Sequence, residues 1–459
     1  GVTPQTGVTF TCDDLGTQLV ELWGMDVAGN VDYCETYVIV QDNGGWCNIS
    51  SGSVAGLLTN ESNSGLEDAN VELDGSHPAL PPVNLFDFTD NNGHYEFAAV
   101  PFLGDYTVTP TKDNDPLNGV STFDLVLINK HILGLEPLNS PYKMISADAN
   151  GSRSITTFDI VELRKLILGI YTELPNNTSW RFVDANYVFP NPSNPFQEIW
   201  PETKQIAAMQ QSMMDENFIA AKIGDVNGNA VTNNLMQVED RTEGTLLFDV
   251  NDRKVKAGET FTVNFRAAER ATGYQFTMYF PNLEVVDLKP GMDMSTGNFG
   301  IFNAEHALTT SFDNEQVNGE FAVTFRAKAS GNLSDMLAIS SRITKAEAYS
   351  LSRERQAVAL RFNGQNGPII SGLGFELYQN QPNPWVNKTQ IAFHLPEAAE
   401  ATLTIFDESG RMLFTQKGNF GKGYNAIAID RALVETTGVL FYKLETATDS
   451  AVKKMIQSK

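Results

Sequence analysis

Two twelve-residue segments place oxygen-bearing groups at matching positions, each 35 residues apart. In the second segment the candidate ligands are Asp148, Asn150, Ser152, the Ser154 carbonyl, Thr156 and Asp159. In the first they are Asp113, Asp115, Leu117 through its carbonyl, the Gly119 carbonyl, Ser121 and Asp124. Calcium takes about six to eight oxygen ligands, and calcium loops supply them from positions 1, 3, 5, 7, 9 and 12. The spacing therefore predicts two calcium sites.

Each segment departs from an ideal calcium loop at one point. Leu117 at position 5 offers no side-chain oxygen, which weakens the first loop. The sharp turn at position 6 favours Gly, but Asn118 and Arg153 stand there. Asn tolerates the left-handed region and Arg does so less readily, so the second loop is expected to be strained. The alternative is that both segments only cap the helices that follow them.

A third fragment begins like another calcium loop, with Asp225, Asn227 and Asn229 at positions 1, 3 and 5. Position 12 is Met236, which has no acidic group. The fragment either supplies ligands to a shared site or forms a plain turn.

A Leu/Ile-rich helical segment follows each of the two full loops and ends at Gly134 or Gly169. Asp at position 12 and the lack of a full helix before each loop resemble the type I dockerin pattern. That resemblance implies calcium, and partner contacts on the outward helix faces. The candidates for such contacts are Asn129, Lys130, His131, Arg164 and Lys165. Because the repeat lies in mid-chain, we favour the alternative that both helices pack against neighbouring domains.

The chain of 459 residues is too long for one core, and three to five domains are expected. A net charge of −24 leaves nothing to neutralise phosphates, which excludes nucleic acid as a partner. No stretch approaches the roughly 20 apolar residues of a transmembrane segment. The start at Gly1, without Met or leader, predicts a processed chain or a fragment.

The three cysteines all lie before residue 48. Cys12 and Cys34 flank a strand, turn and strand pattern, which predicts a disulfide and an oxidising compartment. Cys47 either stays free or pairs with a residue upstream. Three buried thiols are the alternative.

Strand patterns before the loops indicate two units. Residues 1–47 form the first unit, and their segment TCDDLGTQLVELWGMDVAGNVDYCETYVIV resembles the last half of an immunoglobulin-like repeat of the HYR kind. Residues 48–112 alternate like a small antiparallel sandwich. They resemble the carboxypeptidase regulatory-like family through Gly65-Leu66, Asp68-Ala69-Asn70-Val71, Gly93-His94-Tyr95 and Gly104-Asp105-Tyr106.

The loops and a Pro-rich tail expected to wrap them form a module of residues 113–238. About nine strand candidates then predict a sandwich over 239–363. It resembles the cohesin-like family through Val255-Lys256-Ala257-Gly258, Gly273-Tyr274-Gln275-Phe276 and Asn318-Gly319-Glu320-Phe321, against a generic immunoglobulin-type sandwich. Residues 364–374 are Gly-rich and uncharged, which predicts a flexible linker.

Residues 375–459 carry a dense set of matches and period-two apolar strands. They resemble the C-terminal sorting domain of the Bacteroidetes type IX secretion system. The resemblance assigns the sorting signal to Pro382, Asn383, Pro384, Gly410, Lys453 and Lys454. It implies recognition by a secretion translocon, an extracellular or outer-membrane location, and attachment to surface polysaccharide.

The fold class expected is mainly β, a chain of immunoglobulin-like sandwiches with one small helical calcium module. No nucleophile with a partnered base, carboxylate pair or phosphate loop appears, so we expect no enzyme. The function predicted is a secreted structural or adhesive surface protein. Alternatives are a cohesin and dockerin type of assembly or self-association, a fibre, or the non-catalytic part of a larger secreted enzyme. Trp180 and Trp200 could stack on sugars or fill the Pro-rich tail.

Overall fold

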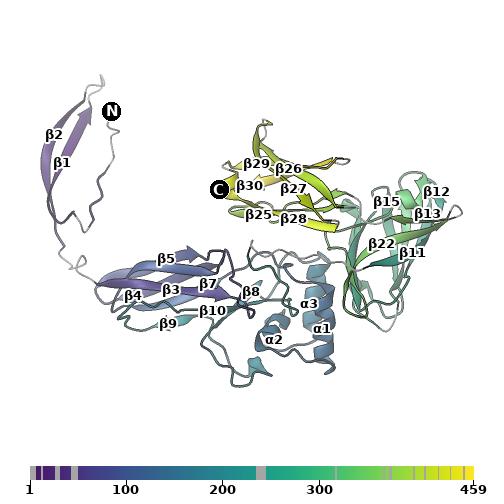
Figure 1. Cartoon of the computed structure of the whole chain (residues 1–459), viewed down its shortest axis with the longest axis horizontal. Helices are drawn as coiled ribbons and strands as arrows, with labels where there is room; N and C mark the ends of the chain where they lie inside the picture. Colours follow the sequence, from purple (N-terminus) through teal and green to yellow (C-terminus); the bar gives the residue numbers. More distant parts are fainter. Residues whose placement is uncertain are drawn as a thin grey trace.

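The computed structural model is built mainly of β-sheets (Figure 1). The residues described are 7–11, 14–25, 31–42, 50–233, 244–315, 318–364, 367–371, 375–395, 398–407, 410–421, 423–434, 436–447 and 450–458. Three sandwiches and one helical module follow an N-terminal hairpin. The predicted fold class is confirmed.

The hairpin consists of β1 (Gly16–Met25) and β2 (Val31–Val40), paired antiparallel with Gly16 opposite Val40. Cys34 on β2 is exposed and forms no disulfide with another described residue. Its expected partner Cys12, and Cys47, lie outside the described residues. The disulfide therefore stays a prediction.

The first sandwich contains strands from two distant parts of the chain. Its early strands are β3 (Ser51–Thr59), β4 (Asn70–His77), β5 (Leu80–Phe88), β6 (His94–Pro101) and β7 (Asp105–Thr111). Its late strands are β8 (Trp180–Asp184), β9 (Lys204–Ile206) and β10 (Phe218–Lys222). The two sheets have the orders β6-β3-β10-β8 and β5-β4-β7-β9.

The first sandwich does not end at residue 112 as predicted. The Pro-rich tail adds strands β8, β9 and β10 to it and also covers the helices. Successive side chains of a strand point to opposite faces, so β8 and β10 can contribute residues to two cores. Phe182 and Phe218 enter the core of the first sandwich, and Val183 and Ala221 enter the core of the helical module. The short helix η3 (Pro195–Gln197) lies in the Pro-rich segment between β8 and β9.

The helical module contains α1 (Thr122–Ile132), α2 (Pro141–Ala147) and α3 (Thr157–Ile167). Ser121 with Asp124, and Thr156 with Asp159, form a capping box at the start of α1 and α3. The residue at position 12 of each predicted loop therefore fixes a helix start as well.

The second sandwich is one rolled sheet with the order β15-β18-β13-β11-β22-β21-β14-β17-β16, with β20 beside β14 and β23 beside β22. Its strands up to β17 are β11 (Thr245–Asn251), β12 (Lys254–Val255), β13 (Thr260–Ala267), β14 (Gly273–Tyr279), β15 (Leu283–Pro290), β16 (Phe299–Phe302) and β17 (Ala307–Phe312). The others are β18 (Glu320–Ala327), β19 (Gly331–Asn332), β20 (Ala338–Ser340), β21 (Glu347–Tyr349), β22 (Arg355–Gly364) and β23 (Gly367–Ser371). Short helices η4 (Thr296–Asn298), η5 (Asn303–Glu305) and η6 (Leu333–Asp335) connect them.

The segment predicted as a flexible linker, 364–374, contains β23. This strand pairs with β22 in a hairpin, with Gly364 opposite Gly367. Gly367 has a φ of 96°, a conformation that glycine adopts without strain. Residues 367–371 therefore extend the second sandwich.

The third sandwich ends the chain. Its strands are β24 (Glu376–Leu377), β25 (Lys388–Leu395), β26 (Ala399–Asp407), β27 (Met412–Phe420), β28 (Gly423–Asp430), β29 (Gly438–Glu445) and β30 (Ser450–Gln457), with η7 (Arg431–Leu433) before β29. They form sheets of order β24-β25-β28 and β27-β26-β29-β30. Trp385, Phe393 and Tyr442 fill the core between them.

Candidate functional site

The second predicted loop, residues 148–159, folds its two carboxylates into one turn. Asp148 accepts backbone N–H groups from Ser152 at 2.9 Å and Arg153 at 2.7 Å. Asp159 accepts the N–H of Asn150 at 3.2 Å. Asp148 and Asp159 are both buried. Burial raises the pKa of Asp148, and the nearby charge of Asp159 raises it further.

The remaining predicted ligands of this loop belong to the same turn. Asn150 accepts the Ser152 N–H at 3.0 Å, and Thr156 donates its N–H to Asp159 at 2.8 Å. The Ser152 hydroxyl lies 3.0 Å from the Ser154 hydroxyl. The structure therefore brings the predicted side chains of the second loop together.

Arg153 adopts the left-handed conformation that its position requires, with a φ of 62°. Its guanidinium donates to the carbonyls of Phe196 at 2.7 Å and Glu198 at 2.6 Å. Hydrogen bonds from a charged donor are stronger than neutral ones. Arg153 thus offsets backbone strain by fastening the Pro-rich segment to the loop.

We expect Arg153→Asn to free this segment and leave the loop intact, because Asn tolerates a positive φ but cannot reach the carbonyls. Limited proteolysis should cut residues 186–200 at least tenfold faster in the variant, since lost hydrogen bonds lower the cost of local opening by about 1.4 kcal/mol or more. The control is Arg153→Lys, which keeps a cation at this position. Equal cleavage of wild type and Arg153→Asn would contradict the fastening role.

The first predicted loop does not assemble as twelve consecutive residues. Asp113 accepts the N–H and hydroxyl of Ser179, at 2.8 and 2.9 Å. Asp115 is exposed, with a φ of 49°. Leu117 packs on the helical core. Glycine is required at position 119 for a steric reason, because a Cβ there would lie 2.7 Å from the backbone of Ala230.

Asp225 takes the place predicted for Asp113. Its carboxylate accepts the N–H groups of Gly228 at 2.7 Å and Ala230 at 2.8 Å. Asp124, at the start of α1, accepts the N–H of Val226 at 3.0 Å. Residues 225–231 therefore complete a loop with residues 121–124, about 100 positions earlier in the chain.

This discontinuous loop repeats the hydrogen bonds of the continuous one. Asn229 donates its N–H to Asn227 at 3.0 Å, as Ser152 does to Asn150. Gly228 at position 4 has a φ of 81°, and Gly151 has 66°. The full set of corresponding positions is Asp225, Asn227, Asn229, the Val231 carbonyl, Ser121 and Asp124.

Val231 was not predicted as a ligand, and Asn118 was not predicted to join the two halves of the loop. Asn118 accepts the Val231 N–H at 2.9 Å and donates to the Val231 carbonyl at 2.7 Å. The signal was present, because Asp225-x-Asn227-x-Asn229 matches Asp148-x-Asn150-x-Ser152 better than the segment from Asp113 does.

The discontinuous loop contains two buried carboxylates. Asp124 and Asp225 are buried, and neither forms an ion pair with a described residue. Burial raises the pKa of both carboxyls, and the charge of Asp225 raises that of Asp124 further. Lys222 is the nearby buried cation, but its ammonium donates to the carbonyls of Pro116 and Ile223, at 2.8 and 3.0 Å.

The donor set fits calcium better than other metals. Each loop offers two carboxylates with amide, hydroxyl and carbonyl oxygens, which are the hard ligands that calcium accepts in flexible geometry. Nowhere in the described part of the chain do three Asp, Glu, His or Cys side chains gather in one metal-binding group. Neither loop contains a Cys or His, so neither provides the thiolate or imidazole ligands of a zinc site.

The outward faces of α1 and α3 lie against the second sandwich of the same chain (Figure 1). Arg164 forms an ion pair with Asp313 at 2.6 Å, and Lys130 with Glu315 at 3.3 Å. These are two of the predicted partner-contact residues, and their partners lie in the neighbouring domain.

The first turn of α1 makes the tightest part of this contact. Thr122 donates its N–H and hydroxyl to the Gln275 side chain on β14, at 2.6 and 2.8 Å. Its hydroxyl also lies 2.8 Å from that of Ser311. The Phe123 and Tyr349 rings stack at 4.9 Å. Because Thr122 follows the candidate ligand Ser121, the discontinuous loop and this contact share one turn of helix.

The C-terminal end of α3 is held by two hydroxyl groups. Thr344 donates to the Ile167 carbonyl at 2.7 Å, and Thr309 donates to the Leu168 carbonyl at 2.8 Å. Both threonines are buried. These bonds satisfy carbonyls that the helix end leaves without an intrahelical partner.

Trp180 and Trp200 are buried, with 2% and 6% of their surface exposed. Trp180 lies in the core of the first sandwich, and Trp200 packs in the helical module. The expectation that they could stack on a sugar is therefore wrong, because both side chains fill protein cores.

The predicted sorting residues hold the third sandwich together. Asn383, between Pro382 and Pro384, accepts the Ile456 N–H of β30 at 2.8 Å. Gly410 makes a turn with a φ of 82°. Lys454 is exposed. Burial lowers the pKa of the half-buried Lys453, as does Arg342 of the second sandwich.

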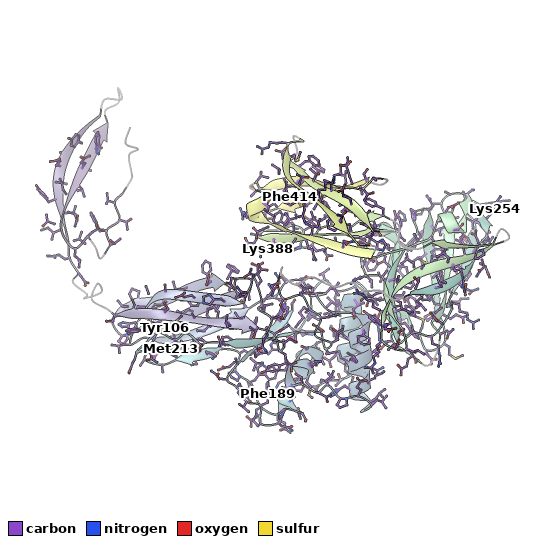
Figure 2. The ribbon with its side chains drawn as sticks, in the orientation of Figure 1. Tyr106, Phe189, Met213, Lys254, Lys388 and Phe414 are labelled. Carbon is purple, nitrogen blue, oxygen red and sulfur yellow. The ribbon has the colours of Figure 1, made fainter. Side chains whose placement is uncertain are left out.

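The third sandwich also contacts the first. Lys388, labelled in Figure 2, forms ion pairs with Glu67 and, at 3.2 Å, with Asp68. Lys112 donates to the Glu67 and Asp68 carbonyls at 2.9 and 3.0 Å. The three sandwiches are thus in contact through the helical module and through Lys388.

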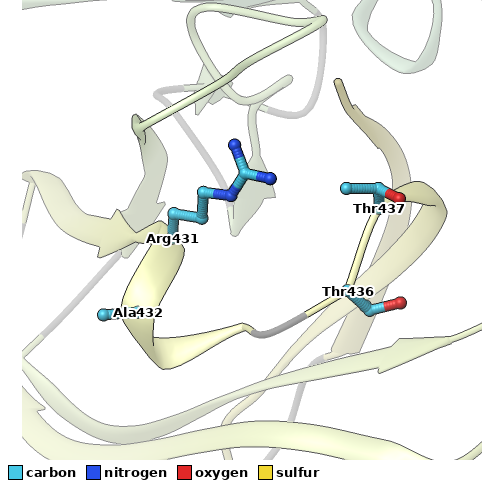
Figure 3. Close-up of a pocket in the computed structure, with 4 residues that line it drawn as sticks. All are labelled: Arg431, Ala432, Thr436 and Thr437. Carbon is cyan, nitrogen blue, oxygen red and sulfur yellow. The ribbon is translucent and has the colours of Figure 1, made fainter. Parts of the chain in front are cut away.

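A cavity of about 660 Å³ lies beside η7 in the third sandwich (Figure 3). Its lining residues are Arg431, Ala432, Thr436 and Thr437. They offer one guanidinium and two hydroxyls. No described helix is long and apolar enough to cross a bilayer.

Several solved structures resemble parts of the chain at low similarity. The sixth cohesin of Acetivibrio cellulolyticus scaffoldin B, crystallised with a Cel5 dockerin mutant, is 16% identical over 29% of this chain and 100% of that one, with a TM-score of 0.21. The major pilin subunit BcpA of Bacillus cereus is 8% identical over 89% and 98%, with a TM-score of 0.17. Dimeric latent PorU of Porphyromonas gingivalis is 10% identical over 53% and 36%, with a TM-score of 0.17. Likeness at this level carries no inference about function.

No curated protein sequence matches the chain. Residues 381–458 match the family described as the secretion system C-terminal sorting domain. The match confirms the sorting domain that the sequence predicted for residues 375–459. The protein therefore carries a type IX sorting domain at its C-terminal end and is a secreted protein of the extracellular space or the outer-membrane surface.

Proposed function

We propose that this protein is a non-catalytic structural or adhesive element of the cell surface, stiffened after export by calcium in its helical module. One observation carries the proposal. Two loops, one continuous and one discontinuous, share a hydrogen-bond pattern that turns two carboxylates each into the protein interior. A pair of buried carboxylates is costly unless a cation balances it.

In the continuous loop the ion would be held by Asp148, Asn150, Ser152, the Ser154 carbonyl, Thr156 and Asp159. In the discontinuous loop it would be held by Asp225, Asn227, Asn229, the Val231 carbonyl, Ser121 and Asp124. When bound, calcium supplies positive charge that neutralises the carboxylates. An ion bound to the discontinuous loop would connect the beginning of the module to its end. Closing such a long loop of chain reduces the entropy of the unfolded state.

The position of the module explains why stiffness would matter. Its strands β8 and β10 are shared with the first sandwich, and α1 and α3 contact the second. A module that is folded tightly therefore fixes two sandwiches relative to each other. This suits a stalk, an adhesive rod or a scaffold. Surface polysaccharide and the secretion translocon are the partners that the sorting domain suggests.

The test is thermal unfolding in EGTA and in 10 mM calcium. Extracellular calcium modules bind at roughly 0.1–1 mM, so 10 mM calcium should stabilise each site by about 1.4–2.7 kcal/mol. Magnesium at the same concentration is the control, because it demands a tighter octahedral site and should stabilise less. An unchanged melting temperature in calcium would remove the proposal of a metal module.

A second candidate is assembly between molecules, favoured by the contact of α1 and α3 with the second sandwich. The same surfaces from two copies could form this contact between molecules. Sedimentation at increasing protein concentration, with and without calcium, separates the two arrangements. Calcium-dependent association supports assembly, and a monomer under both conditions assigns the contact to a single chain.

A further inference from the structure

A lysine lies between two carboxylates inside the first sandwich. Lys204 on β9 is 5% exposed, and its Nζ lies 3.0 Å from Asp184 at the end of β8 and 3.4 Å from Glu216 just before β10. The strands β9 and β8 belong to the two different sheets of the sandwich. The three side chains therefore meet between the sheets.

The surroundings of this group are apolar and fixed. The Phe218 ring lies 5.8 Å from the Lys204 Nζ, and the buried Tyr95 donates its hydroxyl to the Glu216 carbonyl at 2.5 Å. The Asn186 N–H donates to the same Asp184 oxygen that faces Lys204, at 2.9 Å. Both carboxylates thus face one amine, and their side chains are mostly buried, with 22% of Asp184 and 12% of Glu216 exposed.

A salt bridge explains this arrangement incompletely. One carboxylate suffices to pair a buried ammonium, and a second adds a buried negative charge that no other described cation balances within ion-pair distance. The Lys204 Nζ lies within 3.4 Å of an oxygen of each carboxylate, so an amine, an acceptor acid and a proton carrier are adjacent.

We propose that Lys204 and Asp184 join in an intramolecular amide bond, with Glu216 carrying the proton. The cross-link connects the two sheets of the first sandwich and closes the Pro-rich segment between residues 184 and 204. It is independent of calcium and of the function proposed above.

The reaction balances without any co-reactant. The Lys204 ammonium passes one proton to the Asp184 carboxylate, giving a neutral amine and a neutral acid. The amine lone pair forms the Nζ–Cγ bond while the carbonyl π electrons move to oxygen. The Glu216 carboxylate takes a proton from the attached nitrogen and returns it to the hydroxyl of Asp184. The C–O bond breaks, one water leaves, and Glu216 is a carboxylate again.

Lys222 provides a matched comparison. It is also buried, at 4% exposed, but its ammonium donates to two carbonyls and forms no ion pair with a described residue. A lysine with carbonyl partners has no acid to condense with. Lys222 should therefore stay unmodified.

The test is mass spectrometry of the intact protein and of its tryptic peptides. Cleavage after Arg181, Lys204 and Lys222 would give peptides 182–204 and 205–222 from an unmodified chain. The amide blocks cleavage at Lys204, so we expect a single peptide 182–222 that lacks one water, about 18 Da by the loss of water in amide formation. A cyclised aspartate elsewhere would also lose one water but would leave cleavage at Lys204 intact.

Lys204→Arg and Glu216→Gln should both abolish the loss of water, while Lys222→Arg keeps it. Circular dichroism verifies that each variant is folded, and Lys204→Arg retains a cation for that purpose. A full-length mass equal to that of the sequence, with normal cleavage at Lys204 in the folded wild type, overturns the proposal. Loss of water that persists in Lys204→Arg does so as well.

Discussion

Replacing Asp225 with Asn is expected to weaken calcium binding at one of two sites at least tenfold, and replacing Asp113 with Asn is not. In the structure Asp225 stands at position 1 of the discontinuous loop, where its two oxygens accept three backbone N–H groups. Affinity of calcium loops follows the number of charged ligands. Loss of one of two carboxylates therefore costs about 1.4 kcal/mol of binding free energy or more.

Asp113 is the matched control because it occupies position 1 of the loop that the sequence predicted. Its carboxylate caps Ser179 instead, so Asp113→Asn should lose a fraction of stability and keep both sites. Isothermal titration of each variant measures the number of sites and their affinities. Weakened binding in Asp113→Asn with normal binding in Asp225→Asn would show that residues 113–124 form the first calcium loop, and would reject the discontinuous loop.

The sequence predicted the arrangement of the continuous loop, but it did not show which residues complete the discontinuous one, for a physical reason. All six ligand positions of residues 148–159 lie within one stretch of chain, so a spacing pattern describes them completely. The other loop is joined through space by Asn118 and Val231, which are 113 positions apart. The 35-residue spacing of the repeat led to Asp113 as position 1. The segment from Asp225 has better ligands at positions 3 and 5, namely Asn227 and Asn229.

Long-range pairing limited the fold prediction in the same way. Alternation predicted strands around residues 51–111, but nothing in those residues shows that β10 lies beside β3, with Phe218 opposite Leu58. The sequence did not decide between exposed and buried positions for Trp180 and Trp200, because the residues that cover them come from distant parts of the chain. The sequence around Lys453 did not show that this residue is half-buried, close enough to Arg342 and Glu376 for their charges to affect its pKa.

Gln275→Leu is expected to separate the helical module from the second sandwich. The substitution keeps the shape of the side chain but leaves the N–H and hydroxyl of Thr122 without their acceptor inside the contact. Each buried donor without a partner costs about 1–3 kcal/mol. Thermal unfolding should then resolve into separate transitions, and small-angle scattering should report a larger radius of gyration.

Two further variants test whether the contact itself is responsible. Thr122→Val removes the hydroxyl from the helix side and leaves the sandwich unaltered, so it should have a smaller effect in the same direction. Thr262→Val removes one member of an exposed hydroxyl pair with Thr324 on the same sandwich, and should change stability by less than about 0.5 kcal/mol. A Gln275→Leu protein that unfolds like wild type would show that the contact contributes no free energy.

Calcium and this contact should also depend on each other, because Ser121 and Thr122 are consecutive residues in one helical turn. If the ion orders that turn, EGTA weakens the contact that Gln275→Leu removes. The stability lost by EGTA and Gln275→Leu together should therefore be smaller than the sum of their separate effects, as happens for groups that act through one element. If the two losses of stability are strictly additive, calcium binding and the domain contact are independent of each other.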